Sequence, residues 1–457
     1  TPPTLPELPI YFEGENDGSF DNSDYLLFYA KAANVWEWDN NSKTYYHEKH
    51  LYADTSFYWI NIGTENGKRI TTSSQSSEQS THTFDTYENH QFYETDKINF
   101  IKSGRNWYGD YFDIVSGLKK NFSFTHINKV PDEKIHFKAK FVVRSTTSSG
   151  NTITVKNEGN TVHQTANINN VSTQYTANYV VEKTILDSFN TSGIISNMEF
   201  AYNQPVSGAV AWLDYIEVKT ESYLNLGTSP LEFSQPKSVG AGNISEFEIN
   251  NTSINTKIWN ITSPYDVSEI ASSFNNSKTT FKTSTDSIKS FIAFNNSGFR
   301  TPFYISEISN QNLQSLTDIE YIIITANEFK SHAEELAEFH IQNSNLNAKV
   351  VTLQEVYNEF SNGHADITAI RNFMKYLYKN ASSEESKIKS LLLFGDGNYD
   401  PKKRISNETY FIPSYQSENS ISPTASYISD DYFGMLDDEN GISSSSSTVD
   451  IGIGRFP

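Results

Sequence analysis

The segment 395–400, with the sequence GDGNYD, places glycines beside several oxygen-bearing side chains. Glycine allows the chain to turn sharply at this point. Asp396 is a candidate for an active-site or substrate-binding carboxylate. Asp396, Asn398 and Asp400 also have the i, i+2, i+4 spacing of a calcium loop with oxygen ligands. The rest of an EF-hand loop is missing, because the sequence PKKR follows. The segment is therefore a structural turn, the edge of an active site or a metal loop.

Two further acidic segments have the sequences SDDYFG at 429–434 and DDENG at 437–441. Adjacent carboxylates raise one another's pKa or recruit a cation. Asp430 is thus either part of an acidic surface turn or a pocket carboxylate that receives a basic side chain of a substrate. The segment 17–24 also has spacing that suits calcium, and we interpret it as a solvated turn.

Composition and missing motifs exclude several kinds of chemistry. The 457 residues include no cysteine, which excludes disulfides, thiolate zinc sites and a thiol nucleophile within them. A net charge of −20, from 55 acidic and 35 basic residues, argues against a nucleic-acid partner. The HExxH, GxSxG, Walker A and GxGxxG motifs are missing. No run of 18 apolar residues predicts a transmembrane segment.

An alternation of strands and helices from about residue 315 onward would position the GDGNYD segment. One helix is predicted to carry Phe329, Ala333, Leu336 and His340 near one face, and a second to begin at the N-cap Asp366. His364, just before this cap, is assigned a loop or capping role. Apolar, β-branched runs predict strands at 321–325, 348–352 and 388–394. This order predicts a parallel sheet covered on both faces, with ligands bound beyond the carboxyl ends of its strands, where GDGNYD lies.

The preceding 300 residues are predicted to be all-β. Period-two alternation marks strands around 137–141, 153–155 and 216–218. Aromatic runs predict strands at 25–30 and 56–62, and the polar stretch 71–82 predicts a loop. We expect a β-rich domain at 1–115, a β-sandwich region at 116–300 and the first part of an α/β domain at 301–457. Because an apolar strand at 449–457 ends the sequence without a cap, we also expect the chain to be the N-terminal part of a longer protein.

Long stretches of the chain resemble the gingipain-like C25 cysteine peptidases. The motifs are SLLLFGDGNYDPKKR at 390–404, IPSYQSENSISPTASYISDDYFGMLDDENG at 412–441 and VDIGIGRFP at 449–457. The front half resembles the N-terminal regions of the cell-surface sortases of the type IX secretion system within this family. It does so through LPIYFEGENDGSFDNSDYLLFYAK at 8–31, HEKHLYADTSFYWINIG at 47–63 and YETDKINFIKSGRNWYGDYFD at 93–113.

The resemblance implies a caspase-like α/β peptidase domain, here incomplete, and a His–Cys dyad downstream of Pro457. This chain alone is then expected to be inactive. The resemblance also implies that Asp430 is a candidate acid of a specificity pocket. It implies that no cofactor is required, but family members bind calcium, which makes Asp396, Asn398 and Asp400 candidate calcium ligands. The whole protein would cut C-terminal secretion signals from cargo and attach the cargo to anionic lipopolysaccharide, on the extracellular side of the bacterial outer membrane. Its partners would be cargo signal domains and a PorV-like outer-membrane β-barrel.

The alternative is a non-catalytic surface adhesin or glycan-binding protein with a degenerate peptidase-like domain. The lack of cysteine supports it if the chain is complete. A Gly-His-Gly loop followed by a Cys in the gene beyond residue 457 would favour the enzyme instead.

Overall fold

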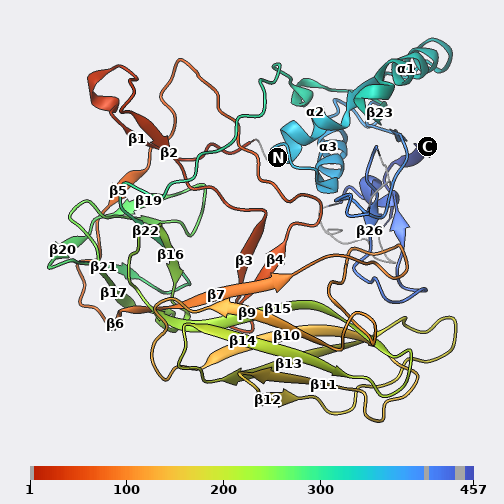
Figure 1. Cartoon of the computed structure of the whole chain (residues 1–457). Helices are drawn as coiled ribbons and strands as arrows, with labels where there is room; N and C mark the ends of the chain where they lie inside the picture. The colour runs from red at the N-terminus through yellow and green to blue at the C-terminus, as the bar shows by residue number, and fades with distance from the viewer. Residues whose placement is uncertain (1–4, 406–410, 438–447) are drawn as a thin grey trace.

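The computed structural model describes residues 5–405, 411–437 and 448–457. Two β-sandwiches occupy the lower and left parts of Figure 1, and an α/β unit lies at the upper right. The predicted architecture, all-β domains followed by an α/β domain with a parallel sheet, is confirmed. Among the described residues, no helix is long and apolar enough to cross a membrane.

The first sandwich packs two antiparallel sheets face to face. One sheet has the order β13 (Val181–Phe189), β10 (Ile135–Arg144), β15 (Val210–Tyr223) and β7 (Thr86–Glu94), and β8 (Tyr111–Phe112) also pairs with β15. The other has the order β12 (Asn160–Gln164), β11 (Thr152–Asn157), β14 (Ile195–Asn203) and β9 (Lys119–Thr125).

The period-two pattern predicted the strands of this sandwich correctly. Phe137, Ala139 and Phe141 of β10 are buried, whereas Lys138 and Lys140 between them are partly exposed. Strands β11 and β15 follow at the predicted places. The boundary expected at residue 115 differs from the structure, because β7 and β8 precede it and pair with β15.

The second sandwich contains strands that precede the first sandwich in the sequence and strands that follow it. One sheet has the order β16 (Leu231–Ser234), β22 (Ser290–Phe294), β18 (Lys257–Asn260), β19 (Ser268–Ile270) and β5 (Thr71–Ser73). The other has the order β20 (Ser273–Asn275), β21 (Lys278–Ser284), β17 (Ile244–Asn250) and β6 (His82–Phe84). The prediction of a loop throughout 71–82 was therefore wrong at its ends. Both β5 and β6 are edge strands held by backbone hydrogen bonds, which do not require apolar side chains.

Two small hairpins complete the N-terminal region. They are β1 (Tyr11–Glu13) with β2 (Tyr25–Leu27), and β3 (Asn34–Asp39) with β4 (Thr44–Lys49). The predicted strand at 25–30 is thus confirmed for its first half. The strand predicted at 56–62 was wrong, since this segment has no strand partner and Ile60 and Ile62 are exposed.

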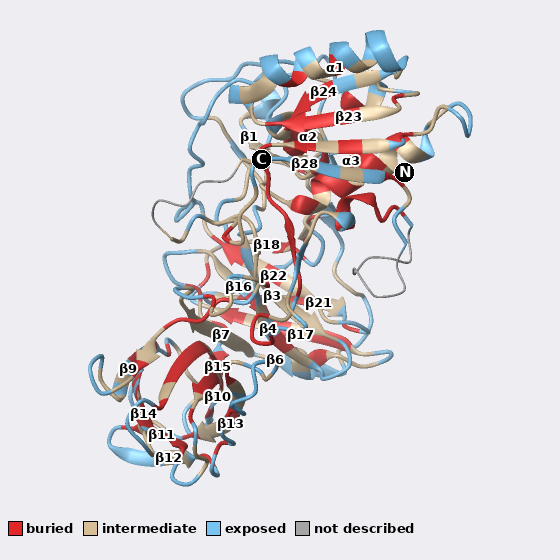
Figure 2. Cartoon of the chain, turned by 90° about the vertical axis from the view of Figure 1, so that its right-hand side faces the viewer, coloured by how far each residue is buried: buried red, intermediate tan, exposed pale blue. Residues whose placement is uncertain are grey.

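The α/β unit contains a wholly parallel sheet. Its order is β24 (Ala348–Thr352), β23 (Tyr321–Thr325), β25 (Ser390–Phe394) and β28 (Gly452–Phe456). Helix α1 (Lys330–Ser344) covers one face through Ala333 and Ala337. Helices α2 (Leu353–Phe360) and α3 (Ile367–Lys379) cover the other. Figure 2 shows buried strands between helices whose outer faces are exposed.

Local signals explain where these helices begin. As predicted, the Asp366 carboxylate caps α3 by accepting the Thr368 N–H at 2.8 Å. The predicted stripe of α3, which includes Ile370 and Met374, is buried. Helix α2 was not predicted, although Thr352 and Glu355 form a capping box at its start.

Candidate functional site at the carboxyl edge of the sheet

The carboxyl ends of the four parallel strands meet at one edge of the α/β unit. Two hydrogen bonds tie β25 to its neighbours there. The Gly395 N–H donates to the Phe456 carbonyl at 2.8 Å, and the Thr325 hydroxyl donates to the Phe394 carbonyl at 3.1 Å. In sheets of this type ligands bind beyond this edge, which makes the loops that follow β25 the candidate site.

The GDGNYD segment leaves β25 as a tight turn. Gly395 has φ 149°, and a Cβ there would lie 2.8 Å from the Phe411 Cβ. The Asp396 carbonyl accepts the N–H groups of Phe411 and Ile412, and its carboxylate accepts the Gly397 N–H at 2.8 Å. Asp396 thus lies at the carboxyl edge of the sheet, where its position after β25 had been predicted, and its carbonyl holds the returning chain.

Asp430 lies in the same region, but its carboxylate is paired with Arg455 of β28. The Arg455 Nε and Nη2 donate to the two Asp430 oxygens at 2.7 and 2.8 Å. Such a bidentate pair is among the strongest arrangements of arginine and carboxylate. The predicted pocket acid is therefore occupied by a guanidinium of the same chain.

Arg455 also joins the other loops of the edge. Its Nη1 donates to the carbonyls of Gly395 and Ile412 at 2.9 and 3.0 Å, and its Nη2 to the Ser414 hydroxyl at 2.9 Å. Only 15% of its side chain is exposed. One side chain thus fixes the turn after β25, the segment that returns at residue 411 and the 3₁₀ turn η5 (Asp431–Gly434).

Asn398 and Asp400 close the turn. The Asn398 side-chain oxygen accepts the Asp400 N–H at 2.8 Å. The Asp400 carboxylate, which is 1% exposed, accepts the Ile405 N–H at 2.8 Å and pairs with Arg404 at 3.0 Å. Among the described residues, no three His, Asp or Glu side chains form a group that could hold a metal ion. These contacts are those of a structural turn, and the Asp400 carboxylate is already paired with Arg404.

The other acidic candidates are surface features. Asp431 begins η5, and its N–H donates to the Ser429 hydroxyl at 3.1 Å. Asp438 and the rest of the second acidic segment lie outside the described residues. The carboxylates of Asp17 and Asp21 accept nearby N–H groups, as expected for solvated turns.

A loop of the first sandwich, residues 97–109, is docked against the candidate site. The Gly104 N–H donates to the Gln416 side chain at 3.1 Å, and the Arg105 N–H to the Ser417 carbonyl at 2.9 Å. The Trp107 and Tyr399 rings stack with centroids 5.8 Å apart. The sandwich therefore braces the segments on both sides of residues 406–410.

A chain of ion pairs extends this contact into the sandwich. Arg404 bonds to Asp96 at 3.2 Å, and Lys49 bonds to Asp96 at 2.8 Å. Burial alone would raise the pKa of Asp96, but the hydrogen bond and charge of Lys49 and the charge of Arg404 outweigh it and lower the pKa. Asp96 is therefore held as an anion between two cations.

His47 lies at the far end of this series of ion pairs, between two carboxylates. Its Nδ1 is 2.7 Å from Glu217 and its Nε2 is 2.5 Å from Glu94, and its side chain is 5% exposed. Burial lowers the pKa of His47, but the hydrogen bonds and charges of Glu217 and Glu94 outweigh it and raise the pKa. The sequence gives no sign of this cluster, because no short motif joins residues 47, 94 and 217. His364 lies in its predicted loop, with Nδ1 2.8 Å from the Ser361 carbonyl.

Comparison with known proteins matches the α/β unit to one family. Residues 314–457 match the family model of peptidase family C25. A search of curated proteins found no significant match.

Among solved structures, the chain is similar to the crystal structure of dimeric latent PorU from Porphyromonas gingivalis. The TM-score is 0.82 at 21% identity, and the match covers 100% of this chain and 43% of that chain. The chain thus has the fold of part of PorU and spans less than half of its length.

Two carbohydrate-binding modules have low scores. They are the CBM36-1 domain of a xylanase from the hindgut metagenome of Trinervitermes trinervoides and the C-terminal CBM6 of LamC from Zobellia galactanivorans. Their identities are 12% and 14% and their TM-scores 0.18 and 0.17. They cover 28% and 29% of this chain, and 96% and 100% of their own chains.

Proposed function

We propose that this chain is part of a PorU-like sortase, a cysteine peptidase of family C25. The observation that carries the proposal is the coincidence of the C25 match, residues 314–457, with the parallel-sheet unit and its carboxyl edge. The similarity of fold to PorU, which includes both sandwiches, supports the more specific assignment.

In this proposal, the complete protein cleaves C-terminal secretion signals from cargo. A thiolate attacks the peptide carbonyl, a histidine acts as general base and backbone N–H groups stabilise the oxyanion. An amine on anionic lipopolysaccharide then takes the acyl group in place of water. Residues 1–457 contain no cysteine, so this chain alone forms no thioester. The protein acts on the extracellular side of the outer membrane, next to a PorV-like barrel.

The role of the described residues is to build and hold one side of the site. Arg455 and Asp430 fix the loops at the edge of the sheet, and the 97–109 loop braces them from the sandwich. While Asp430 pairs with Arg455, it offers no free carboxylate to a substrate. A basic side chain of a substrate would have to displace Arg455 before it could bind Asp430. The proposed pocket role of Asp430 therefore requires that the ion pair between Arg455 and Asp430 opens.

The test uses the full-length product of the gene that encodes this chain. It is incubated with a cargo protein that carries a C-terminal secretion signal, and the products are identified by mass spectrometry. We expect cleavage before the signal, and none with residues 1–457 alone. Intact cargo after incubation with the full-length protein, in the presence of its partner barrel and reductant, would overturn the proposal.

The alternative is a non-catalytic surface binder, which the lack of cysteine in residues 1–457 would favour only if the complete protein also contained none. The same experiment separates the two, since a binder would retain the cargo or a glycan without cutting it.

A further inference from the structure

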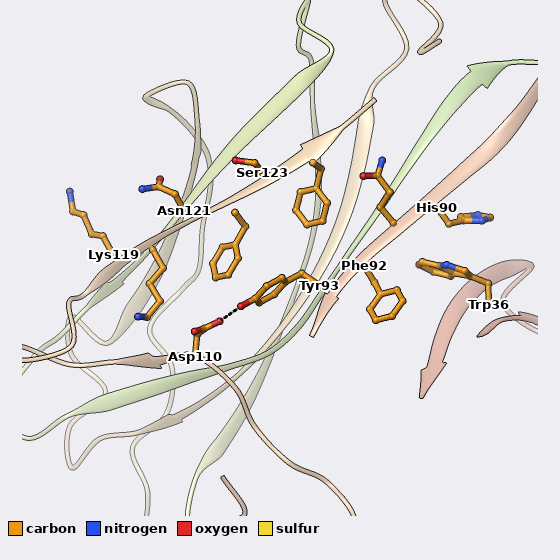
Figure 3. A pocket seen from close by; sticks show the side chains of 12 residues that line it. Trp36, His90, Phe92, Tyr93, Asp110, Lys119, Asn121 and Ser123 are labelled. Atoms are coloured by element: carbon orange, nitrogen blue, oxygen red, sulfur yellow. Dashed lines mark hydrogen bonds between the residues drawn. The ribbon is translucent and has the colours of Figure 1, made fainter. Parts of the chain in front are cut away.

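A slot with a volume of about 900 Å³ opens at one side of the first sandwich, between strands β7 and β9. These are the end strands of the two packed sheets. Figure 3 shows Lys119, Asn121 and Ser123 on one side of the slot, and Tyr93, Phe92 and His90 on the other, with Trp36 beyond them. The slot lies far in the sequence from the candidate site and shares no lining residue with it.

The slot exposes the edges of the strands. All residues from Lys119 to Phe124 line it, as do all from His90 to Tyr93. Because side chains alternate between the faces of a sheet, a pocket on one face would be lined by every second residue of a strand. Consecutive lining residues show that the slot opens onto the backbone itself.

Most outer backbone groups of β9 have no partner among the described residues, except the Thr125 carbonyl, which accepts from the Gln91 side chain at 2.8 Å. The His126 N–H donates to the Ile194 carbonyl, and the Tyr202 N–H donates to the Leu118 carbonyl. In this antiparallel register the even-numbered residues of β9 exchange hydrogen bonds with β14, so the N–H groups of Asn121 and Ser123 point away from it. Among the described residues, no hydrogen bond uses either of these two N–H groups.

We propose that this slot binds an extended peptide segment of another protein by β-strand addition to the outer edge of β9. Main-chain hydrogen bonds supply the affinity in this type of recognition, and alternate side-chain contacts supply the specificity. The proposal goes beyond the proposed peptidase function and does not depend on it.

A peptide suits the slot better than a sugar. The Phe122 and Phe124 side chains beside the edge of β9 are buried and offer no ring face on which a sugar could stack. Six residues of β9 line the slot, so a strand of about six residues, about 20 Å long, would span it. An added strand would satisfy the unpaired donors, which a flat apolar contact would leave exposed.

The lining predicts the pattern of the peptide. Side chains directed inward would contact Tyr93, Phe122 and Phe124 and should be apolar. Side chains directed outward would lie beside Asn121 and Ser123 and should be polar. Lys119, which is 63% exposed and whose ammonium is 3.8 Å from Glu199, favours a carboxylate near one end.

The test measures fluorescence anisotropy of labelled hexapeptides with a glutamate followed by alternating apolar residues and threonines, the apolar positions being Val, Ile, Leu or Phe. We expect at least one to bind the 457-residue chain. Ser123→Pro, which removes an outward N–H, should weaken binding about tenfold. Ser123→Ala, which removes only the hydroxyl bonded to Asn197 at 2.6 Å, should change it less than twofold.

A change in the peptide keeps the test independent of folding. N-methylation of the central threonines blocks their N–H groups, and we expect it to abolish binding to the unaltered protein. In hydrogen exchange, the bound peptide should protect the amides of Asn121 and Ser123. Failure of the whole panel to bind, equal binding of N-methylated peptides, or capture of a neutral β-glucan hexasaccharide in the slot instead would overturn the proposal. So would blockage of the slot by a second copy of this chain, detected as a dimer by sedimentation.

Discussion

Replacing Arg455 by methionine should loosen the loops at the carboxyl edge of the sheet while leaving both sandwiches intact. Methionine keeps much of the apolar stem but makes none of the hydrogen bonds to Asp430, Gly395, Ile412 or Ser414. The lost guanidinium also leaves the Asp430 carboxylate unpaired. We therefore expect local destabilisation centred on the segments that follow β25.

The expected size follows from burial. Breaking a buried ion pair costs about 3–5 kcal/mol, and a hydrogen bond to a charged group contributes about 1.5–3 kcal/mol. The side chains of Arg455 and Asp430 remain 15% and 23% exposed, which permits some rehydration. We take the lower bound, about 3 kcal/mol. The double variant Asp430→Asn, Arg455→Met should then cost less than the sum of the single changes.

Hydrogen exchange followed by mass spectrometry is the suitable assay. All six tryptophans precede residue 260, so intrinsic fluorescence reports mainly on the sandwiches. A loss of about 3 kcal/mol corresponds to roughly hundredfold less protection in peptides from β25, β28 and residues 411–416. The matched control is Arg300→Met, since Arg300 is exposed. Unchanged protection in Arg455→Met, or equal loss in both variants, would refute the reasoning.

Three further predictions concern the contacts that support the site. Asp400→Asn should cost about 3 kcal/mol locally. Arg404 and the Ile405 N–H donate to different oxygens of the carboxylate, and asparagine replaces one of these oxygens with an NH2 group that cannot accept. Tryptic cleavage after residues 402 and 403 should become faster, and unchanged cleavage would contradict this. Gly104→Ala should undock the 97–109 loop, because the added Cβ would lie 2.1 Å from the Asn419 carbonyl oxygen. The control is Gly159→Ala, where φ is similarly positive but the space is open, and this change should not undock the loop. Hydrogen exchange in residues 415–422 distinguishes the two variants. His47→Gln should lower the free energy of unfolding most below about pH 6.5, and progressively less as the pH rises through the raised pKa of His47. The reason is that the folded state binds the extra proton on His47. A difference in unfolding free energy between the two proteins that is constant with pH would contradict this.

The sequence allowed prediction of elements whose signals are local. The strands of the parallel sheet appeared as apolar runs, and α3 appeared through its cap Asp366 and its buried stripe. Helix α2 also has a local signal, because Thr352 and Glu355 form a capping box at its start. The aromatic segment 56–62 was misread because strand formation requires a partner strand, and a run of residues alone does not reveal one.

The candidate site could be located but not resolved from sequence. The position of GDGNYD after an apolar strand was sufficient to place Asp396 at the carboxyl edge. The pairing of Asp430 with Arg455 depends on how β28 lies against β25, and the cluster around His47 joins three distant strands. Such contacts are set by tertiary packing, so spacing along the chain gives no sign of them.

The most direct test of the central claim is covalent trapping. The full-length gene product is treated with a thiol-reactive peptide probe, and its intact mass and labelled residue are determined by mass spectrometry. Our account predicts a single adduct on a cysteine outside residues 1–457, and no adduct on residues 1–457 alone. A full-length protein that contains no cysteine, or whose cysteine labels no faster than free thiol, would contradict the assignment as a C25-type cysteine peptidase.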